Sequence, residues 1–209
     1  EYIFQAVTFK NIIENKLLLK SCEVDYDILN SSLFFKMGEY LILKGCCIKD
    51  DELTTEIVSR SYTPVLCRDD MRKGAFKIMV RLYPTGKMSR FLKKLNLSDI
   101  VFWRGPYEEF QYKINSHKYV LLIGGGTGIV PLYNIAKEIV ENDEEETWVK
   151  MLASFKTVNS FILRTELSKL KQYWNFKIDV FITNQNDSNY NMSYNESFLL
   201  NERIDETVI

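Results

Sequence analysis

The sequence predicts two consecutive domains of different classes: an antiparallel β domain and then a parallel α/β domain. Short apolar runs bounded by glycine, proline and polar residues fill the first hundred residues, which is typical of strands joined by turns. From residue 119 onward, strand-like and helix-like segments alternate, and this order implies a parallel sheet with right-handed crossovers. The pattern changes at the polar residues 115–118, so we place the domains at residues 1–114 and 115–209.

In the first domain, the clearest predicted strand is residues 76–83. Apolar and charged residues alternate there, and the segment stops at Pro84, whose ring removes a backbone donor. Helical spacing, with Ser89 at the N-cap position, predicts a helix over residues 89–95. The same turn-bounded pattern predicts further strands at residues 2–9, 16–20, 39–44 and 99–104.

In the second domain, a continuous apolar strand is followed by a glycine loop and a helix. Pro131 suits the first turn of that helix, because its missing N–H would have no helical partner there. An acidic run at residues 141–146 and a polar stretch at residues 184–195 are typical of solvated loops. The pattern predicts strands at residues 119–123, 147–155 and 176–183, and helices at residues 131–142 and 163–173.

The overall composition is that of an ordinary globular protein. The 209 residues include 27 Lys and Arg and 28 Asp and Glu, and this net charge of −1 gives no electrostatic case for nucleic acid as a partner. Four cysteines without a C-x-x-C pair, and His117 as the single histidine, argue against a metal site and favour buried, reduced thiols in an intracellular compartment. The longest apolar stretch, residues 119–133, is interrupted by glycines and is shorter than the ~20 residues that span a bilayer. We therefore expect no membrane segment within this chain and a location on the cytoplasmic side, with an anchor outside the chain left open.

The glycine loop of the second domain is the first segment that could bind an anion. Residues 124–128 read Gly-Gly-Gly-Thr-Gly, a pattern that lets the backbone approach a pyrophosphate while the helix N-terminus presents N–H donors. No Gly-Lys-Ser/Thr follows, so P-loop NTPase chemistry is excluded. A tight strand-to-helix turn without a ligand is the alternative interpretation.

Two segments of the first domain could bind the same kind of ligand. Arg60 offers a planar fork for phosphate oxygens, Tyr62 a flat face for an aromatic ring, and Thr63 a hydroxyl near the edge of that ring. Residues 86–89 place a glycine turn, a cation and a serine cap at a helix start, which is the geometry of an anion site. A strand that ends at a proline and a plain capped helix are the respective alternatives.

Taken in chain order, these motifs resemble the ferredoxin–NADP reductase superfamily and, more narrowly, the NADH-cytochrome b5 reductase family. Residues 102–106 and 155–157 favour the branch called NADH-cytochrome b5 reductase-like, and the resemblance extends over residues 4–194. The motifs are Arg-x-Tyr-Thr-Pro, a strand ending in Tyr83, Gly-Lys-Met-Ser, Arg104-Gly105-Pro106 and Gly-Gly-Thr-Gly-Ile-x-Pro.

The resemblance implies a six-stranded antiparallel flavin-binding β-barrel and a parallel nucleotide-binding α/β domain, with FAD and NADH as cofactors. It places Arg60 at the FAD pyrophosphate, Tyr62 on the isoalloxazine ring and Thr63 near the N5 edge of that ring. Thr63 and Thr127 are the implied catalytic residues, and Thr127 would lie over the flavin where the nicotinamide docks. The implied cofactor-binding residues are Arg60, Ser61, Tyr62, Thr63, Pro64, Met79, Arg81, Tyr83, Gly86, Lys87, Met88, Ser89, Gly125, Gly126, Thr127, Gly128 and Pro131.

The implied reaction is hydride transfer from NADH C4 to flavin N5, followed by two single-electron steps to a haem protein such as cytochrome b5. The redox chemistry belongs to the flavin, and the protein contributes positioning and electronic tuning. This reaction needs no general base, which agrees with a sequence that holds one histidine, His117, expected in the linker between the domains.

Three departures from the family pattern bear on this function. Glu108-Glu109 stands where the family usually has a glycine, and an acidic pair would disfavour an anionic dinucleotide. The family's late Cys-Gly-x-Pro segment is not found, so we expect the last strands of the second sheet to be missing from this chain. Near the end of the second nucleotide-domain strand stands Lys156 rather than an acidic residue, so the preference for NADH over NADPH rests on the resemblance. The alternatives are a non-catalytic flavin-binding or interaction protein and the reductase module of a larger fused flavohaem enzyme.

Overall fold

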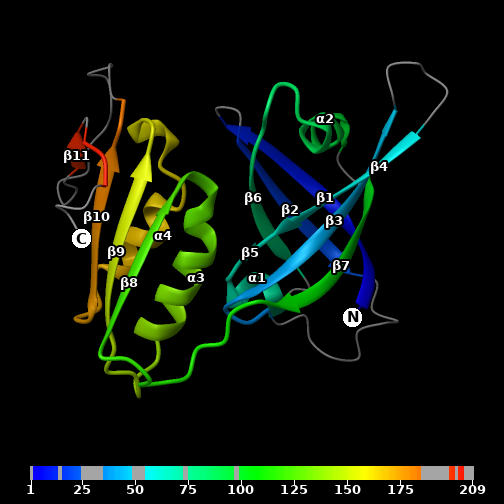
Figure 1. Ribbon diagram of the computed structural model, residues 1–209. Coiled ribbons are helices and arrows are strands. Elements are labelled where there is room, and N and C mark those ends of the chain that lie inside the picture. Colours follow the sequence, from blue (N-terminus) through cyan, green and yellow to red (C-terminus); the bar gives the residue numbers. More distant parts are fainter. Residues whose placement is uncertain are drawn as a thin grey trace. The chain divides into compact units, whose positions relative to one another are not determined.

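The computed structural model describes most of the chain. The described residues are 2–13, 16–24, 35–48, 55–72, 75–96, 99–184, 198–200 and 202–204. The chain divides into two compact units, Glu1–Gln111 and Tyr112–Ile209. Each unit has a sheet of its own (Figure 1).

The first unit is built on one antiparallel sheet that bends back on itself. In spatial order the strands run β4-β3-β7-β1-β2-β6-β5. The two strands at the ends of this order, β4 and β5, are consecutive in the chain with only Thr63 between them, so the sheet closes like a barrel at that residue. The predicted antiparallel barrel is thus confirmed, with a two-residue seventh strand. The strands are β1 (Tyr2–Ile13), β2 (Lys16–Val24), β3 (Glu39–Ile48), β4 (Thr55–Tyr62), β5 (Pro64–Val65), β6 (Phe76–Arg81) and β7 (Ile100–Glu108).

An apolar core fills the interior of this sheet. Burial alternates along β6 and β7, as the period of two in a strand requires, and points Phe76, Ile78 and Trp103 inward. The Trp103 ring meets the Phe76 ring edge to face, with centroids 5.2 Å apart. Cys46, on β3, is exposed as a free thiol, so the expectation of buried cysteines is wrong there, because Cys46 lies on the strand face opposite the buried Leu41 and Leu43.

Within the described residues of the first unit, two helices accompany the barrel. The short α1 (Arg68–Arg72) follows β5, and α2 (Lys87–Lys94) follows β6. A Cβ atom added at Gly45 of β3 would lie 2.6 Å from the Phe91 ring, so a glycine is what allows α2 to pack this closely on the sheet. The helix predicted at residues 89–95 is therefore present but starts two residues earlier.

The second unit is a parallel α/β sheet, as predicted. Its strands are β8 (Tyr119–Gly125), β9 (Trp148–Phe155), β10 (Phe176–Ile182) and β11 (Phe198–Leu200), in the order β11-β10-β9-β8. All adjacent pairs run parallel, so their carboxyl ends meet at one edge. β11 was not expected from the sequence, and the loop predicted at residues 184–195 lies outside the described residues except for Asn184.

Helices α3 (Ile129–Val140) and α4 (Arg164–Leu170) cover the same face of this sheet (Figure 1). A Cβ atom at Gly124 would lie 2.5 Å from Leu132 of α3, and α4 lines a small hollow with Ile178 and Val180 of β10. Gly124 of β8 and Val180 of β10 are both paired with Ala153 of β9, one on each side. Residues paired in this way lie on the same face of a sheet, so α3 and α4 contact one face. In the described part of the chain, no helix is long and apolar enough to cross a membrane.

A buried carboxylate ties the segment before β8 to the turn before β9. Glu145 is 5% exposed and accepts hydrogen bonds from the Asn115 backbone N–H (3.0 Å) and the Thr147 hydroxyl (2.5 Å). The Tyr112 hydroxyl lies 3.2 Å from Glu145, and burial, the largest cause, raises the pKa of that phenol. Most of the predicted acidic loop is solvated, but this one glutamate is part of the fold.

Candidate functional site

The segment around Arg60 lies where the barrel closes. Along β4, Arg60 and Tyr62 lie on the same face of the strand as the buried Val58, and Ser59 and Ser61 lie on the other face. Across the ladder they pair with Leu43 and Leu41 of β3, both fully buried. Thr63 joins β4 to β5, which begins at Pro64. The sequence therefore brings an exposed cation and an aromatic ring to one face of the closing strand.

Tyr62 is half-buried and offers a neutral aromatic ring. Its ring lies edge-on to the Trp103 ring, with centroids 6.4 Å apart. Burial raises the pKa of Tyr62 to about 12, and the Arg60 charge offsets part of that effect. The phenol is therefore uncharged over the physiological range of pH, which suits stacking against a planar ligand.

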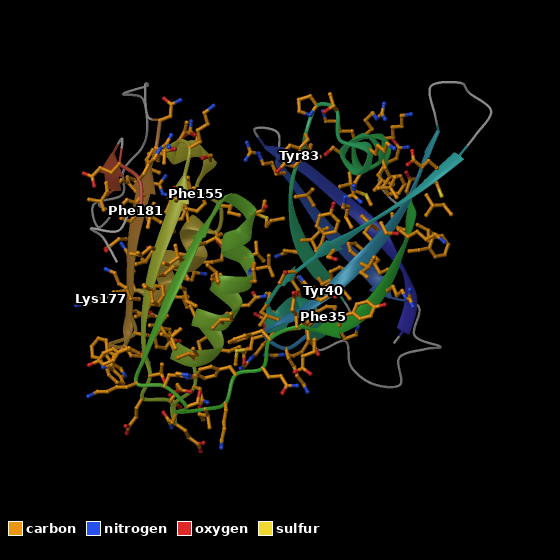
Figure 2. The ribbon with its side chains drawn as sticks, in the orientation of Figure 1. Phe35, Tyr40, Tyr83, Phe155, Lys177 and Phe181 are labelled. Carbon is orange, nitrogen blue, oxygen red and sulfur yellow. The ribbon has the colours of Figure 1, made fainter. Side chains whose placement is uncertain are left out.

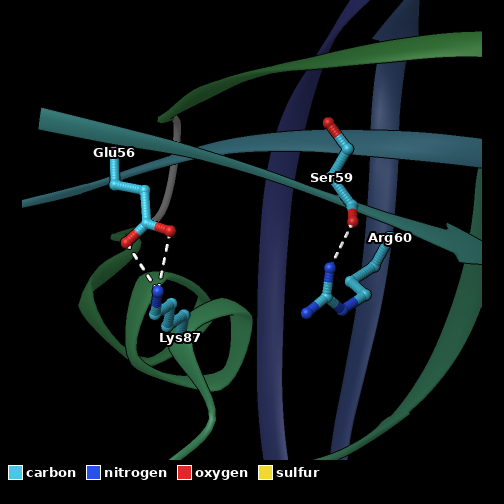
Figure 3. A network of polar contacts seen from close by, with 4 residues as sticks. All are labelled: Glu56, Ser59, Arg60 and Lys87. Atoms are coloured by element: carbon cyan, nitrogen blue, oxygen red, sulfur yellow. Dashed lines mark hydrogen bonds and ion pairs between the residues drawn. The ribbon is translucent and has the colours of Figure 1, made fainter.

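Two cations near this face already have partners within the protein (Figure 3). The Lys87 ammonium donates to both carboxylate oxygens of Glu56, each at 2.7 Å, and so joins the start of α2 to β4. One Arg60 guanidinium nitrogen donates to the Ser59 carbonyl at 2.7 Å. Sequence reasoning missed Glu56, although its position four residues before Arg60 in a strand placed both on one face.

The turn before α2 is organised by Ser89, but not as predicted. Gly86, in an extended conformation, is the N-cap residue, and Ser89 is the third residue of the helix, within its first turn. The Ser89 hydroxyl accepts a hydrogen bond from the Tyr83 backbone N–H at 2.9 Å, which holds the turn against the helix. The prediction of Ser89 as the cap is wrong for this reason. Its hydroxyl still has a proton to donate, although the residue is 5% exposed.

Arg81 and Tyr83 form a second exposed group at the end of β6. The Arg81 guanidinium lies 5.4 Å from the centre of the Tyr83 ring, and both residues are exposed. Met79 is half-buried on the same face of β6, opposite the face that enters the core. Met88 is buried beneath α2. The Met88 side chain therefore belongs to the core, and the resemblance implies a role for the Met88 backbone rather than for this side chain.

In the second unit, the glycine loop runs from the end of β8 through the turn Gly126–Gly128 into α3. A Cβ atom at Gly125 would lie 2.9 Å from the Ser154 carbonyl, so the fold itself requires this glycine. Gly126 has a φ of +54°, which favours glycine, and a Cβ atom there or at Gly128 would meet nothing within 4 Å. The half-buried Thr127 stands between these two open positions.

The open space at the glycine loop fits the close approach of a diphosphate to the backbone. Pro131 occupies the third position of α3, within the first turn, where its missing N–H loses no helical hydrogen bond. The loop precedes a helix of 12 residues whose N-terminus faces the same edge of the sheet. Among the described residues, no group of three or more potential metal ligands is present.

The sequence matches two known domain families in succession. Residues 19–112 match the family described as oxidoreductase FAD-binding domain, and residues 117–207 match the family described as ferric reductase NAD binding domain. The protein named NADH-cytochrome b5 reductase-like of Homo sapiens is 34% identical over 169 residues, which are 80% of this chain and 51% of that protein. The chain belongs to the NADH-cytochrome b5 reductase family.

A second curated relative is similar in sequence, and solved structures are similar in fold. NADH-cytochrome b5 reductase 2 of Saccharomyces cerevisiae is 39% identical over 132 residues, which are 62% of this chain and 43% of that reductase. The chain thus spans about half the length of the curated relatives that it matches. The cytochrome b5 reductase domain of Ulva prolifera nitrate reductase has the same fold, with a TM-score of 0.72 at 21% identity over 95% of this chain and 77% of that domain.

The fold also occurs in a flavohaem-type protein. The FAD/NAD-binding domain of nitric oxide dioxygenase from Vibrio cholerae has a TM-score of 0.71 at 16% identity, over 99% of this chain and 81% of that domain. The two units of this chain are accordingly an FAD-binding domain and an NAD-binding domain. FAD and NADH, the cofactors expected from the sequence, are those of these two domain families.

Proposed function

We propose that this chain is an FAD-dependent NADH reductase that passes electrons to a one-electron acceptor such as cytochrome b5. The observation that carries the proposal is that one chain combines the exposed Arg60 beside the half-buried Tyr62 with an open glycine loop at Gly126 and Gly128. The first feature belongs to an FAD-binding domain and the second to an NAD-binding domain. Family relatives named as cytochrome b5 reductases support the choice of acceptor.

The residues of the first unit fit FAD in charge and shape. Arg60 and Lys87 supply two cations for a diphosphate, and Arg81 with Tyr83 supplies an exposed cation and ring near the end of β6. Tyr62 supplies a neutral aromatic surface, and Thr63 a hydroxyl next to it in the chain. When bound, the flavin would supply the capacity to accept a hydride and to release electrons one at a time.

The residues of the second unit would hold the nicotinamide nucleotide. Gly126 and Gly128 leave room for phosphate oxygens at the backbone, and the N-terminus of α3 favours negative charge there. Thr127 carries the only side chain within the turn Gly126–Gly128, so it is the residue of this turn that would orient the nucleotide. His117 is exposed before β8, with its Nδ1 2.9 Å from the Ser116 hydroxyl. We assign it no part in proton transfer.

The experiment that tests this function is a visible spectrum of the purified chain before and after anaerobic addition of NADH. A flavin spectrum that bleaches, and then recovers on addition of oxidised cytochrome b5, supports the proposal. A flavin spectrum that NADH does not bleach favours a non-catalytic flavin-binding protein instead, and absence of flavin after incubation with FAD contradicts the assignment of the Arg60 segment.

A further inference from the structure

The carboxyl ends of β8 and β9 lie side by side in the second unit. The two strands are parallel neighbours, and Gly125 pairs with Ser154 at the point where the glycine loop begins. In a parallel α/β sheet, a dinucleotide bound at the first loop has its adenosine ribose recognised near the end of the second strand. Residues 156–163, which follow β9, are therefore the segment that would meet the ribose 2′ position of a bound dinucleotide.

This segment lacks the group that usually selects NAD. A carboxylate commonly accepts the hydrogen bond of the ribose 2′-OH at this position, and residues 156–163 contain no Asp or Glu. The Thr157 hydroxyl is hydrogen-bonded to the backbone of Ser160, and the Ser160 hydroxyl to the backbone of Thr157. The Ser160 N–H donates to Thr157 Oγ1 at 3.2 Å, and the Ser160 hydroxyl donates to the Thr157 carbonyl at 2.7 Å. The turn thus offers no carboxylate to a free 2′-OH.

Lys156 is the cation of this turn, and its backbone is fixed at the edge of the sheet. The N–H groups of Thr183 and Asn184 donate to the carbonyls of Phe155 and Lys156, both at 2.9 Å. The Lys156 side chain is exposed, whereas Lys137 and Lys150 of the same unit form ion pairs with Glu141 and Asp179. An exposed ammonium on a fixed backbone is suited to a phosphate group.

We propose that this chain accepts NADPH as well as NADH, and that Lys156 is the specificity-determining residue that binds the 2′-phosphate. The inference rests on the function proposed above, because it concerns the adenosine end of the same nucleotide. A charge-assisted contact of this kind contributes about 10- to 100-fold in affinity.

The direct test is calorimetric titration of the full chain with 2′,5′-ADP and with 5′-ADP, in the wild type and in two variants. Lys156→Glu reverses the charge after β9. Lys177→Glu is the matched control, because Lys177 is also exposed but lies near the start of β10, toward the opposite end of the sheet from Phe155 (Figure 2). We expect Lys156→Glu to weaken binding of 2′,5′-ADP at least about tenfold while changing 5′-ADP binding less than about threefold. The control is expected to change neither.

Anaerobic reduction of the bound flavin by NADPH and by NADH gives the second measurement. Comparable rates with both nucleotides support the inference. A preference for NADH greater than about a hundredfold overturns it, as does equal weakening of both ADP ligands by Lys156→Glu or no binding of 2′,5′-ADP to the wild type. If neither nucleotide reduces the flavin while 2′,5′-ADP binding still depends on Lys156, the reductase function fails and the assignment of Lys156 stands.

Discussion

Lys87 and Glu56 are joined by two hydrogen bonds of 2.7 Å, from one ammonium to both oxygens of one carboxylate. Lys87 is the first residue of α2 and Glu56 lies on β4, four residues before Arg60 (Figure 3). A carboxylate thus stands beside the cations that we assign to the FAD diphosphate. Both side chains are partly exposed, so the pair contributes only about 0–1 kcal/mol to stability and a ligand phosphate can replace it.

We expect Glu56→Gln to tighten FAD binding about two- to fivefold, because it removes a negative charge beside the Arg60 and Lys87 cations. The measurement is FAD affinity from quenching of flavin fluorescence during titration of the apoprotein. Asp69→Asn is the matched control, since Asp69 is an exposed carboxylate on α1 whose loss makes the same change in net charge. Weaker FAD binding in Glu56→Gln would show that the ion pair shapes the site instead of competing with the ligand.

Arg60→Ala is expected to lower FAD affinity about 10- to 100-fold, because a charge-assisted hydrogen bond contributes about 1.5–3 kcal/mol. Its present partner, the Ser59 carbonyl, is an exposed surface contact, so its loss should leave the fold intact. The same fluorescence titration measures the effect. Arg72→Ala, at an exposed arginine on α1, serves as the control. Unchanged flavin occupancy in Arg60→Ala would remove Arg60 from the site.

The periodic elements could be predicted from the sequence, while the contacts between distant segments could not. The strand at residues 147–155 appears as β9, one residue shorter, because a continuous apolar run between polar turns leaves few alternatives. The start of α2 was misplaced because an extended Gly86 takes the cap position and Ser89 turns to the Tyr83 N–H instead. The three residues of β11 are too few to give a periodic signal.

For the candidate site, too, the sequence predicts which residues take part but not the contacts between distant segments. The order of motifs predicted which residues belong to it, and their roles stay predictions until a ligand is bound. The partner of Lys87 could not be predicted, because Glu56 is 31 residues away and the two meet only when α2 packs on the barrel. Likewise, the sequence alone does not distinguish Gly125 from Gly128. In the structure, Gly125 makes a tight contact and is required by the fold, whereas Gly128 has open space beside it.

Thr127→Val is expected to leave FAD bound but to slow reduction of the flavin by NADH about tenfold or more, because valine keeps the shape and removes the hydroxyl. Stopped-flow bleaching of the flavin measures this rate. Thr165→Val, at an exposed threonine on α4, is a control for the chemical change itself. A normal rate of bleaching in Thr127→Val would place the hydroxyl away from hydride transfer.

Glu145→Ala is expected to lower the free energy of unfolding of the second unit by about 2–4 kcal/mol. The substitution leaves the backbone N–H groups of Asn115 and Thr147 without the carboxylate that accepts their hydrogen bonds. Urea unfolding followed by the fluorescence of Trp148 and Trp174 measures the loss. Glu144→Ala is the neighbouring control, because Glu144 is exposed and its hydrogen bonds to Asn115 and Asn142 are made by its backbone, which alanine keeps. Equal stability of the two variants would contradict the buried network.

Because the pKa of Tyr62 is raised, the stability of the folded protein depends on pH in a definite direction. An unfolded tyrosine ionises near pH 10, whereas burial raises the pKa of Tyr62 to about 12 in the folded protein. The contribution of Tyr62 to stability is therefore fully present below pH 10 and is lost as the pH rises toward 12, since the unfolded chain releases its proton first. A pH titration of phenolate absorbance in the wild type and in Tyr62→Phe isolates this group. We expect the component lost in Tyr62→Phe to ionise near pH 12, and ionisation near pH 10 would mean that the ring is not packed against Trp103 as the structure has it.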